Sequence, residues 1–239
     1  MMKLKIDLNA DVGEGCGTDE ELFELVTSAN VACGAHAGDA TTMRATVRAA
    51  RERGVTVGAH PSYPDRANFG RVAMERTPEA IYDDVRAQIA ALERIANEEG
   101  VSLRHVKAHG ALYNVAARDR TVADAIARAV RDCDPALAIV ALAGGEQIAS
   151  ARRLGLRAVA EVFADRAYCP DGTLVPRGEP GALIDDADRA VEQALAFVRD
   201  GVGETICLHG DGAHALDFAR RIRAALRDAG IDVTAVVPA

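Results

Sequence analysis

The stretch of sequence that decides the fold is KIDLNAD, residues 5–11, close to the start of the chain. Polar and apolar residues alternate in it with a period of two, which is the period of a β-strand. A strand over these residues would place Asp7, Asn9 and Asp11 together on one face. A half-buried strand with its carboxylates in water would show the same alternation, so the rest of the chain has to distinguish the two interpretations.

Short apolar runs recur along the rest of the chain, with segments of helical spacing between most of them. Runs rich in Val, Ile and Ala that alternate with amphipathic helices are typical of βα units and a parallel sheet. The length of 239 residues is close to the ~250 of one (β/α) barrel. The sequence therefore predicts an α/β fold, a single (β/α)-barrel domain over residues 1–239 with seven or eight parallel strands. The predicted strands are 4–10, 28–33, 55–59, 105–109, 138–143, 158–163, 205–209 and 233–237.

Helix start signals and long connections complete the predicted architecture. TPE at residues 77–79 offers an N-cap, a proline at the first helical position and an acid in the first turn, and Asp39 is a second predicted cap. The connections 61–76 and 166–181 are too long for simple links and are rich in Pro, Gly and Asp. Both follow predicted strands, so we interpret them as lids over a site.

Composition argues against several classes of function. The net charge is −8 and Lys and Arg form no stripe, which argues against a nucleic-acid partner. No run approaches the ~18 consecutive apolar residues of a membrane span, and no signal-peptide core precedes the first strand, so we predict a cytoplasmic protein without a membrane partner. The five cysteines form no CxxC pair, which argues against a disulfide framework and a thiolate zinc site.

Polar side chains follow almost every predicted strand at its carboxyl end. In parallel α/β architectures this end carries the ligand site, because the βα loops converge there. A lone histidine is more often a core or surface residue, but convergence from many segments favours a shared site. The residues that follow this pattern are Asn9, Asp11, Asn30, His36, Asp39, His60, Lys107, His109, Glu161, Asp165, Arg166, His209 and Asp211.

The chemistry of this set is open from the residues alone. No GxSxG elbow, GxxxxGK[ST] phosphate loop or GxGxxG turn occurs. Asp11, His36 and His60 could hold a divalent metal through one carboxylate and two imidazoles, or act as general acids and bases without metal. Lys107 would suit a carboxylate or phosphoryl oxygen, and a buried Asp7 would need a partner such as Lys107.

Six longer motifs carry a resemblance to a known family. They are DLNADVGE (7–14), NVACGAHAGD (30–39), GAHPSYPD (58–65), HGALYN (109–114), EVFADR (161–166) and HGD (209–211). Together they resemble the LamB/YcsF family, whose members serve as the A subunit of the bacterial ATP-dependent 5-oxoprolinase. Two positions depart from the family pattern: Ala108 stands where a proline is usual, and Val72 stands where a second arginine usually follows Arg71.

The resemblance implies a barrel related to the glycoside hydrolase and deacetylase superfamily, and the opening of 5-oxo-L-proline to L-glutamate. It implies ATP with Mg as co-substrate, and subunits B and C of the 5-oxoprolinase as partners. Catalytic roles would fall to Asp11, His60, Lys107, His109 and His209. Substrate or phosphate binding would fall to Asn9, Asn30, Arg71, Glu161, Asp165, Arg166 and Asp211.

Two other functions fit the same residues. One is a metal-dependent deacylase or deacetylase, although the absence of Trp and an aromatic content of 4% argue against a glycan substrate. The other is a non-catalytic subunit that binds the small-molecule substrate while its partners perform the chemistry.

Overall fold

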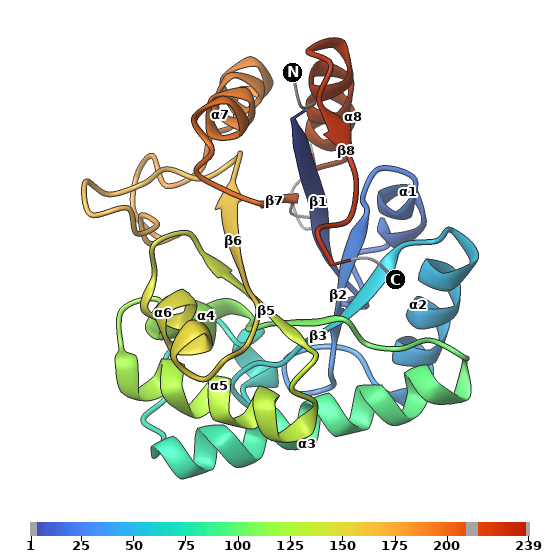
Figure 1. Cartoon of the computed structure of the whole chain (residues 1–239), viewed down its shortest axis with the longest axis vertical. Helices are drawn as coiled ribbons and strands as arrows, with labels where there is room; N and C mark the ends of the chain where they lie inside the picture. The colour runs from blue at the N-terminus through green and yellow to red at the C-terminus, as the bar shows by residue number, and fades with distance from the viewer. Residues whose placement is uncertain (1–3, 209–214, 238–239) are drawn as a thin grey trace.

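The computed structural model describes residues 4–208 and 215–237, in which seven parallel strands close into a barrel (Figure 1). Strands β1 to β7 follow one another around the barrel in chain order, and β1 closes it by pairing with both β2 and β7. A short strand, β8, pairs with the first residues of β1. The predicted α/β barrel is confirmed. The strands are β1 (Lys5–Val12), β2 (Ser28–Ala32), β3 (Thr56–His60), β4 (His105–Lys107), β5 (Ala138–Leu142), β6 (Ala158–Phe163), β7 (Thr205–Leu208) and β8 (Asp232–Val233).

The helices lie around the outside of the strands (Figure 1). Both predicted caps are present, because the Thr77 side chain accepts from the backbone N–H of Ala80 and that of Asp39 accepts from Thr42. None of the helices within the described ranges is long and apolar enough to cross a membrane. The helices are α1 (Asp19–Phe23), α2 (Ala40–Glu52), α3 (Pro78–Glu98), α4 (Gly110–Ala116), α5 (Arg120–Cys133), α6 (Glu146–Arg153), α7 (Ala187–Asp200) and α8 (Ala215–Asp228).

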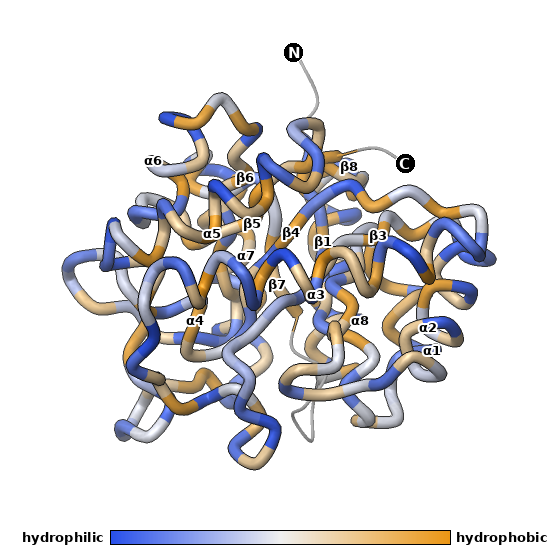
Figure 2. Tube along the Cα trace, turned by 90° about the horizontal axis from the view of Figure 1, so that it is seen from below, coloured by the Kyte–Doolittle hydropathy of each residue, from blue (hydrophilic) through white to orange (hydrophobic). Residues whose placement is uncertain are grey.

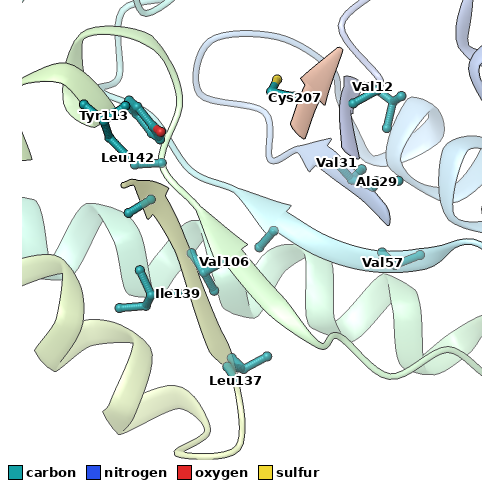
Figure 3. Close-up of a cluster of buried hydrophobic side chains, with 14 of the residues drawn as sticks. Val12, Ala29, Val31, Val57, Val106, Tyr113, Leu137, Ile139, Leu142 and Cys207 are labelled. Carbon is teal, nitrogen blue, oxygen red and sulfur yellow. The ribbon is translucent and has the colours of Figure 1, made fainter. Parts of the chain in front are cut away.

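The apolar core lies between the barrel wall and the helices. Val31, Val57, Val106 and Ile139 stand on the successive strands β2 to β5 and are buried (Figure 3). In the Cα trace, much of the hydrophobic colour lies on the strands at the centre of the molecule, whereas the outer helices alternate between hydrophobic and hydrophilic colours (Figure 2). In β1 every residue from 6 to 10 is buried, so the strand has no water-facing side. This excludes the interpretation of β1 as a half-exposed strand.

Three predicted strands end at least two residues away from the carboxyl ends that the structure gives. β1 ends at Val12, two residues later than predicted. β4 ends at Lys107, two residues earlier than predicted, because the chain turns into α4 at Gly110 with His109 as the N-cap. Helix α4 itself was not predicted, since only seven residues form it. The last strand is Asp232–Val233 rather than 233–237.

The two long connections occupy the same end of the barrel. Residues 61–77 join β3 to α3 and contain one turn of 3₁₀ helix, Arg66–Asn68. Residues 164–186 join β6 to α7, and Tyr168 pairs there with Leu174 in an antiparallel bridge. Both connections contribute residues to one cavity.

Candidate active site

Asp7 on β1 is 2% exposed and accepts hydrogen bonds from three hydroxyl groups. Its Oδ1 accepts from Thr27 at 2.6 Å and from Ser28 at 2.8 Å, and its Oδ2 accepts from Thr205 at 2.6 Å. Burial raises the pKa of Asp7, while the hydroxyl groups oppose that rise. The prediction that Asp7 pairs with Lys107 was wrong, because the lysine meets other carboxylates and the hydroxyl groups satisfy Asp7.

Lys107 on β4 is held by carboxylates from two other strands. Its Nζ lies 3.0 Å from Oδ1 of Asp11 and 2.8 Å from Oε1 of Glu161. It also donates to Oδ1 of Asn9 at 3.2 Å and to the Cys207 sulfur at 3.1 Å. Burial opposes the charge of Lys107, but Asp11, Cys207 and Glu161 outweigh it and hold the pKa well above its ordinary value. The ammonium group is therefore charged and already balanced within the barrel.

Two asparagine side chains connect this ion-pair network across the barrel. Nδ2 of Asn9 donates to Glu161 at 2.9 Å, and Nδ2 of Asn30 donates to Oδ1 of Asn9 at 2.7 Å. Asn30 also donates to Asp11 at 2.8 Å. Burial lowers the pKa of His105 to about 3, so this ring is neutral, and its Nε2 lies 2.8 Å from Oδ1 of Asn30. The amides fix the positions of both carboxylates around Lys107.

His60 and His109 direct one ring nitrogen at each other, with Nε2 of His60 3.0 Å from Nδ1 of His109. The other nitrogen of each ring faces a backbone carbonyl: Nδ1 of His60 lies 2.7 Å from Lys107 O, and Nε2 of His109 lies 2.9 Å from Phe69 O. A carbonyl oxygen only accepts, so each of these outer nitrogens carries a proton. Two neutral rings would then face each other through lone pairs. A cation has to lie between them, either a proton on His60 or a metal ion.

Glu14 and His36 complete this four-residue cluster. Oε1 of Glu14 lies 3.0 Å from Nε2 of His36 and 3.2 Å from Nδ1 of His109. The same oxygen lies 3.8 Å from Nε2 of His60, and the potential ligand atoms of all four residues lie within 4.8 Å of one another. Imidazole ligands of metals usually donate their second nitrogen to a carbonyl or carboxylate, as His60 and His109 do here. The donor set therefore fits a divalent metal such as zinc.

The charges within the cluster are set by burial and by these contacts. Burial opposes the charge of Glu14, but its contacts with His109 and His36 lower its pKa to about 2. Burial lowers the pKa of His36 to about 4 and also lowers that of His109. Burial opposes the charge of His60, but Asp11, with Oδ2 3.2 Å from Nε2, outweighs it and raises the pKa. His60 is thus the imidazole that holds a proton when no metal is bound.

A cavity of about 410 Å³ lies beside this cluster, at the carboxyl ends of the strands. Its volume is within the range of about 300–1,000 Å³ that is usual for small-molecule sites. The acidic, histidine and lysine side chains that line it are Asp11, Glu14, His60, Lys107 and His109. The aromatic side chains that line it are Tyr113 and Phe163. The arginines that line it, all from the two long connections, are Arg71, Arg166 and Arg177.

The structure brings most of the residues singled out in the sequence to this cavity or directly beneath it. Those that line it are Asp11, His60, Arg71, Lys107, His109 and Arg166. Those buried in the network that holds Asp11 and Lys107 are Asn9, Asn30 and Glu161. Asp39 caps α2, and Asp165 lies half-buried in the connection after β6. His209 and Asp211 lie outside the described residues.

Sequence reasoning missed two charged residues of the site, Glu14 and Arg177. Asp11 lies next to the four-residue cluster rather than in it, and Glu14 supplies the carboxylate there. The signal was present, since Glu14 ends the motif at 7–14, and Gly13 before it has a φ of 72° that turns the chain after β1. Arg177 carried no signal, because no periodic pattern surrounds it.

Comparison with known proteins gives a family and a close structural likeness. The model of the LamB/YcsF family matches residues 6–239. The crystal structure of a lactam utilization protein from Thermus thermophilus is 44% identical, with a TM-score of 0.91, over 97% of this chain and 100% of that one.

More distant structures share the fold alone. A family 4 carbohydrate esterase from Streptomyces lividans, in complex with acetate, is 15% identical with a TM-score of 0.52, over 99% of this chain and 98% of that one. The peptidoglycan deacetylase PdaC from Bacillus subtilis is 13% identical with a TM-score of 0.52, over 98% of this chain and 89% of that one. The expected kinship with deacetylase barrels is confirmed for the fold.

Proposed function

Because this chain belongs to the LamB/YcsF family, we propose that it opens a lactam as one subunit of an ATP-dependent 5-oxoprolinase. The proposed reaction converts 5-oxo-L-proline to L-glutamate and hydrolyses ATP with Mg. Subunits B and C are the proposed partners, and the cytoplasm is the proposed location. The likeness to a lactam utilization protein at 44% identity supports this substrate class.

The reaction needs an activated amide and a base. A five-membered lactam is a stable amide. Transfer of the γ-phosphoryl group of ATP to the lactam oxygen releases ADP and activates the carbonyl carbon for attack by water. The C–N bond then breaks, and a second water molecule releases phosphate from the resulting acyl phosphate to leave glutamate. The enzyme then has to take a proton from the water, return one to the ring nitrogen and bind the anionic groups. Cationic, acidic and basic side chains must therefore meet at one small cavity.

The observation that carries the proposal is the pairing of Asp11 and His60 at the cavity. Oδ2 of Asp11 lies 3.2 Å from Nε2 of His60, while Oδ1 accepts from Lys107. Because His60 already carries its proton, Asp11 is the proposed acceptor of a proton from water, and Lys107 and His60 hold its carboxylate in place for that role. The proton of His60 is the one proposed for the leaving nitrogen. His109, 3.0 Å from His60, is suited to pass that proton on towards the leaving nitrogen. His209 is proposed as a further proton carrier.

The cluster of Glu14, His36, His60 and His109 is suited to a divalent metal. A metal ion there would supply Lewis-acid polarisation of a substrate oxygen. The chain's own contribution is to fix the rings: the carbonyls of Lys107 and Phe69 hold the tautomers of His60 and His109 whether or not a metal is bound.

The proposal is tested with the complete complex. The chain is co-purified with subunits B and C, and glutamate formation from 5-oxo-L-proline is measured with and without ATP. Asp11→Asn and His60→Gln are expected to reduce the ATP-dependent rate by about 100-fold or more, the usual weight of a general base. The control Asp83→Asn changes an exposed aspartate of α3 and is expected to leave the rate unchanged. Full activity of Asp11→Asn would falsify the catalytic role.

A metal-dependent deacylase is the second candidate, and the histidine cluster with Glu14 is the observation that favours it. Such an enzyme would act without ATP or partners. The isolated chain, loaded with zinc, manganese or cobalt, is offered N-acetylated and other acylated amines, and amine release is measured. Release that depends on metal and disappears in Glu14→Gln would favour the deacylase over the 5-oxoprolinase.

The chain can also be a non-catalytic subunit that only binds the lactam. In that case Asp11→Asn would weaken substrate binding by the isolated chain while the complex, at saturating substrate, would keep its turnover rate. A change in KM without a change in kcat in Asp11→Asn would therefore indicate a binding subunit, and a lower kcat would indicate a catalytic one.

A further inference from the structure

Arg166 is a buried cation on the cavity wall. The residue is 4% exposed and stands just after β6, in the connection that borders the cavity. Its Nη2 donates to the Val175 carbonyl at 2.6 Å and its Nε donates to the Ala182 carbonyl at 3.4 Å. These neutral acceptors hold the side chain in place but do not balance its charge.

In the part of the chain that the structure describes, the charge of Arg166 has no carboxylate in close contact. Within the described ranges, no carboxylate oxygen lies within 4.0 Å of its guanidinium nitrogens. Burial, and then repulsion from Arg177, lower the pKa of Arg166, and the neighbouring Asp165 offsets this only in part. Buried charges in proteins are normally paired, so the arrangement indicates a place for an anion.

Lys107, a second buried cation that lines the cavity, differs from Arg166 in this respect. Asp11 and Glu161 both lie within 3.0 Å of its Nζ, so two negative charges already surround one positive charge. A further anion beside Lys107 would meet these two carboxylates. Arg166 and Arg177 both lie on the wall of the cavity that is formed by the connection after β6.

We propose that Arg166, with Arg177 beside it, forms the subsite for an oxyanion group of the substrate, either a carboxylate or a phosphoryl group. The inference rests on the proposed function for the identity of the substrate. It assigns the anion to these arginines and leaves Lys107 to hold Asp11 and Glu161.

Guanidinium chemistry suits this role. Of the five N–H groups of Arg166, the two carbonyls use two, which leaves three to donate to an anion. A guanidinium stays charged over the working pH range and binds two oxygens of a carboxylate or phosphate at once. Arg177 is exposed and lines the same cavity, so it adds positive charge at the mouth.

The test measures binding to the full chain by isothermal titration. The probes are 5-oxo-L-proline, 2-pyrrolidinone, which is the same lactam without the carboxylate, and inorganic phosphate. The variants are Arg166→Gln and Arg177→Gln, and the matched control is Arg199→Gln, whose side chain on α7 is 74% exposed. Thermal unfolding without ligand checks the fold of each variant.

If the anion is the carboxylate, Arg166→Gln weakens 5-oxo-L-proline binding by about tenfold or more and leaves 2-pyrrolidinone unchanged. If the anion is the phosphoryl group, Arg166→Gln weakens phosphate binding by a similar factor and leaves 5-oxo-L-proline unchanged. Either result supports the subsite. Arg177→Gln is expected to weaken binding of the same probe by a smaller factor. If Arg166→Gln does not fold, the result with Arg177→Gln tests the subsite.

The subsite is overturned if both anions bind the variants as they bind the parent chain, or if the parent chain binds neither. The outcome is independent of the proposed reaction. Anion binding that needs Arg166, in a chain whose complex forms no glutamate, would keep the subsite and reject the 5-oxoprolinase. If the complex forms glutamate but neither arginine variant changes anion binding, the 5-oxoprolinase is kept and the subsite is rejected.

Discussion

Nε2 of His60 and Nδ1 of His109 lie 3.0 Å apart, with the outer nitrogen of each ring next to a backbone carbonyl. The two inner nitrogens can approach this closely only with positive charge between them. Because Glu14 adds a carboxylate 3.2 Å from His109, the cluster offers a divalent ion a neutralising ligand as well.

Zinc is therefore expected to stabilise the metal-free chain. At a free concentration 100 times its dissociation constant it would add ~2.7 kcal/mol to the free energy of unfolding. For a chain of this size that raises the midpoint of thermal unfolding by roughly 5–10 °C. Glu14→Gln should lose most of the shift, whereas Glu79→Gln, at an exposed position of α3, should keep it. No shift with zinc, cobalt or manganese in the parent chain would contradict a metal site.

Removal of the charge of Lys107 is expected to destabilise the barrel. Lys107→Met leaves Asp11 and Glu161 without their shared cation, and breaking a buried pair in this way costs about 3–5 kcal/mol. Adding Glu161→Gln to the same chain should restore part of the stability by removing one like charge. Urea unfolding measures both effects, with Lys5→Met at an exposed position as the control. A Lys107→Met chain as stable as the parent would reject the account of the network.

The lowered pKa of His105 predicts that the folded chain loses stability in acid. Its pKa is about 3 in the folded chain against an ordinary value of 6.5, so the unfolded chain binds the proton more readily. The contribution of His105 to stability is complete above pH 6.5 and decreases as the pH falls towards 3. At pH 5 the loss is about 2 kcal/mol.

The measurement compares urea unfolding at pH 7 and pH 5. His105→Gln keeps an N–H donor for Asn30 and removes the titrating ring, so its free energy of unfolding should fall less between the two pH values. The same decrease in parent and variant would show that other groups govern the acid response.

The ring of His105 also explains a glycine in β3. A Cβ atom built on Gly58 would lie 2.3 Å from the imidazole, and His105 is too tightly enclosed to withdraw. Gly58→Ala is expected to cost about 1–3 kcal/mol, as overpacked cores do. The control Gly178→Ala has open space at the Cβ position and should cost much less. Recovery in the double variant Gly58→Ala with His105→Ala would identify the ring as the cause, and no recovery would exclude it.

The fold was largely readable from the sequence because it depends on periodicity. Apolar runs such as 138–143 and 158–163 predicted strands that the structure places within one residue, since a strand covered on both faces is mostly apolar. Caps such as Thr77 were equally readable, because a local hydrogen bond defines them. Helix α4 was missed, since one and a half to two turns of helix leave too short a pattern.

The sequence by itself determined which chemical groups gather at the carboxyl end of the barrel, because chain order and strand parity fix which side chains point inward. Only the tertiary structure decided how they pair. Asp7 takes hydroxyl partners, Lys107 takes Asp11 and Glu161, and Glu14 joins the histidines. These choices depend on distances of about 3 Å between strands far apart in sequence, and no periodicity along one chain encodes the height at which two strands meet across a barrel.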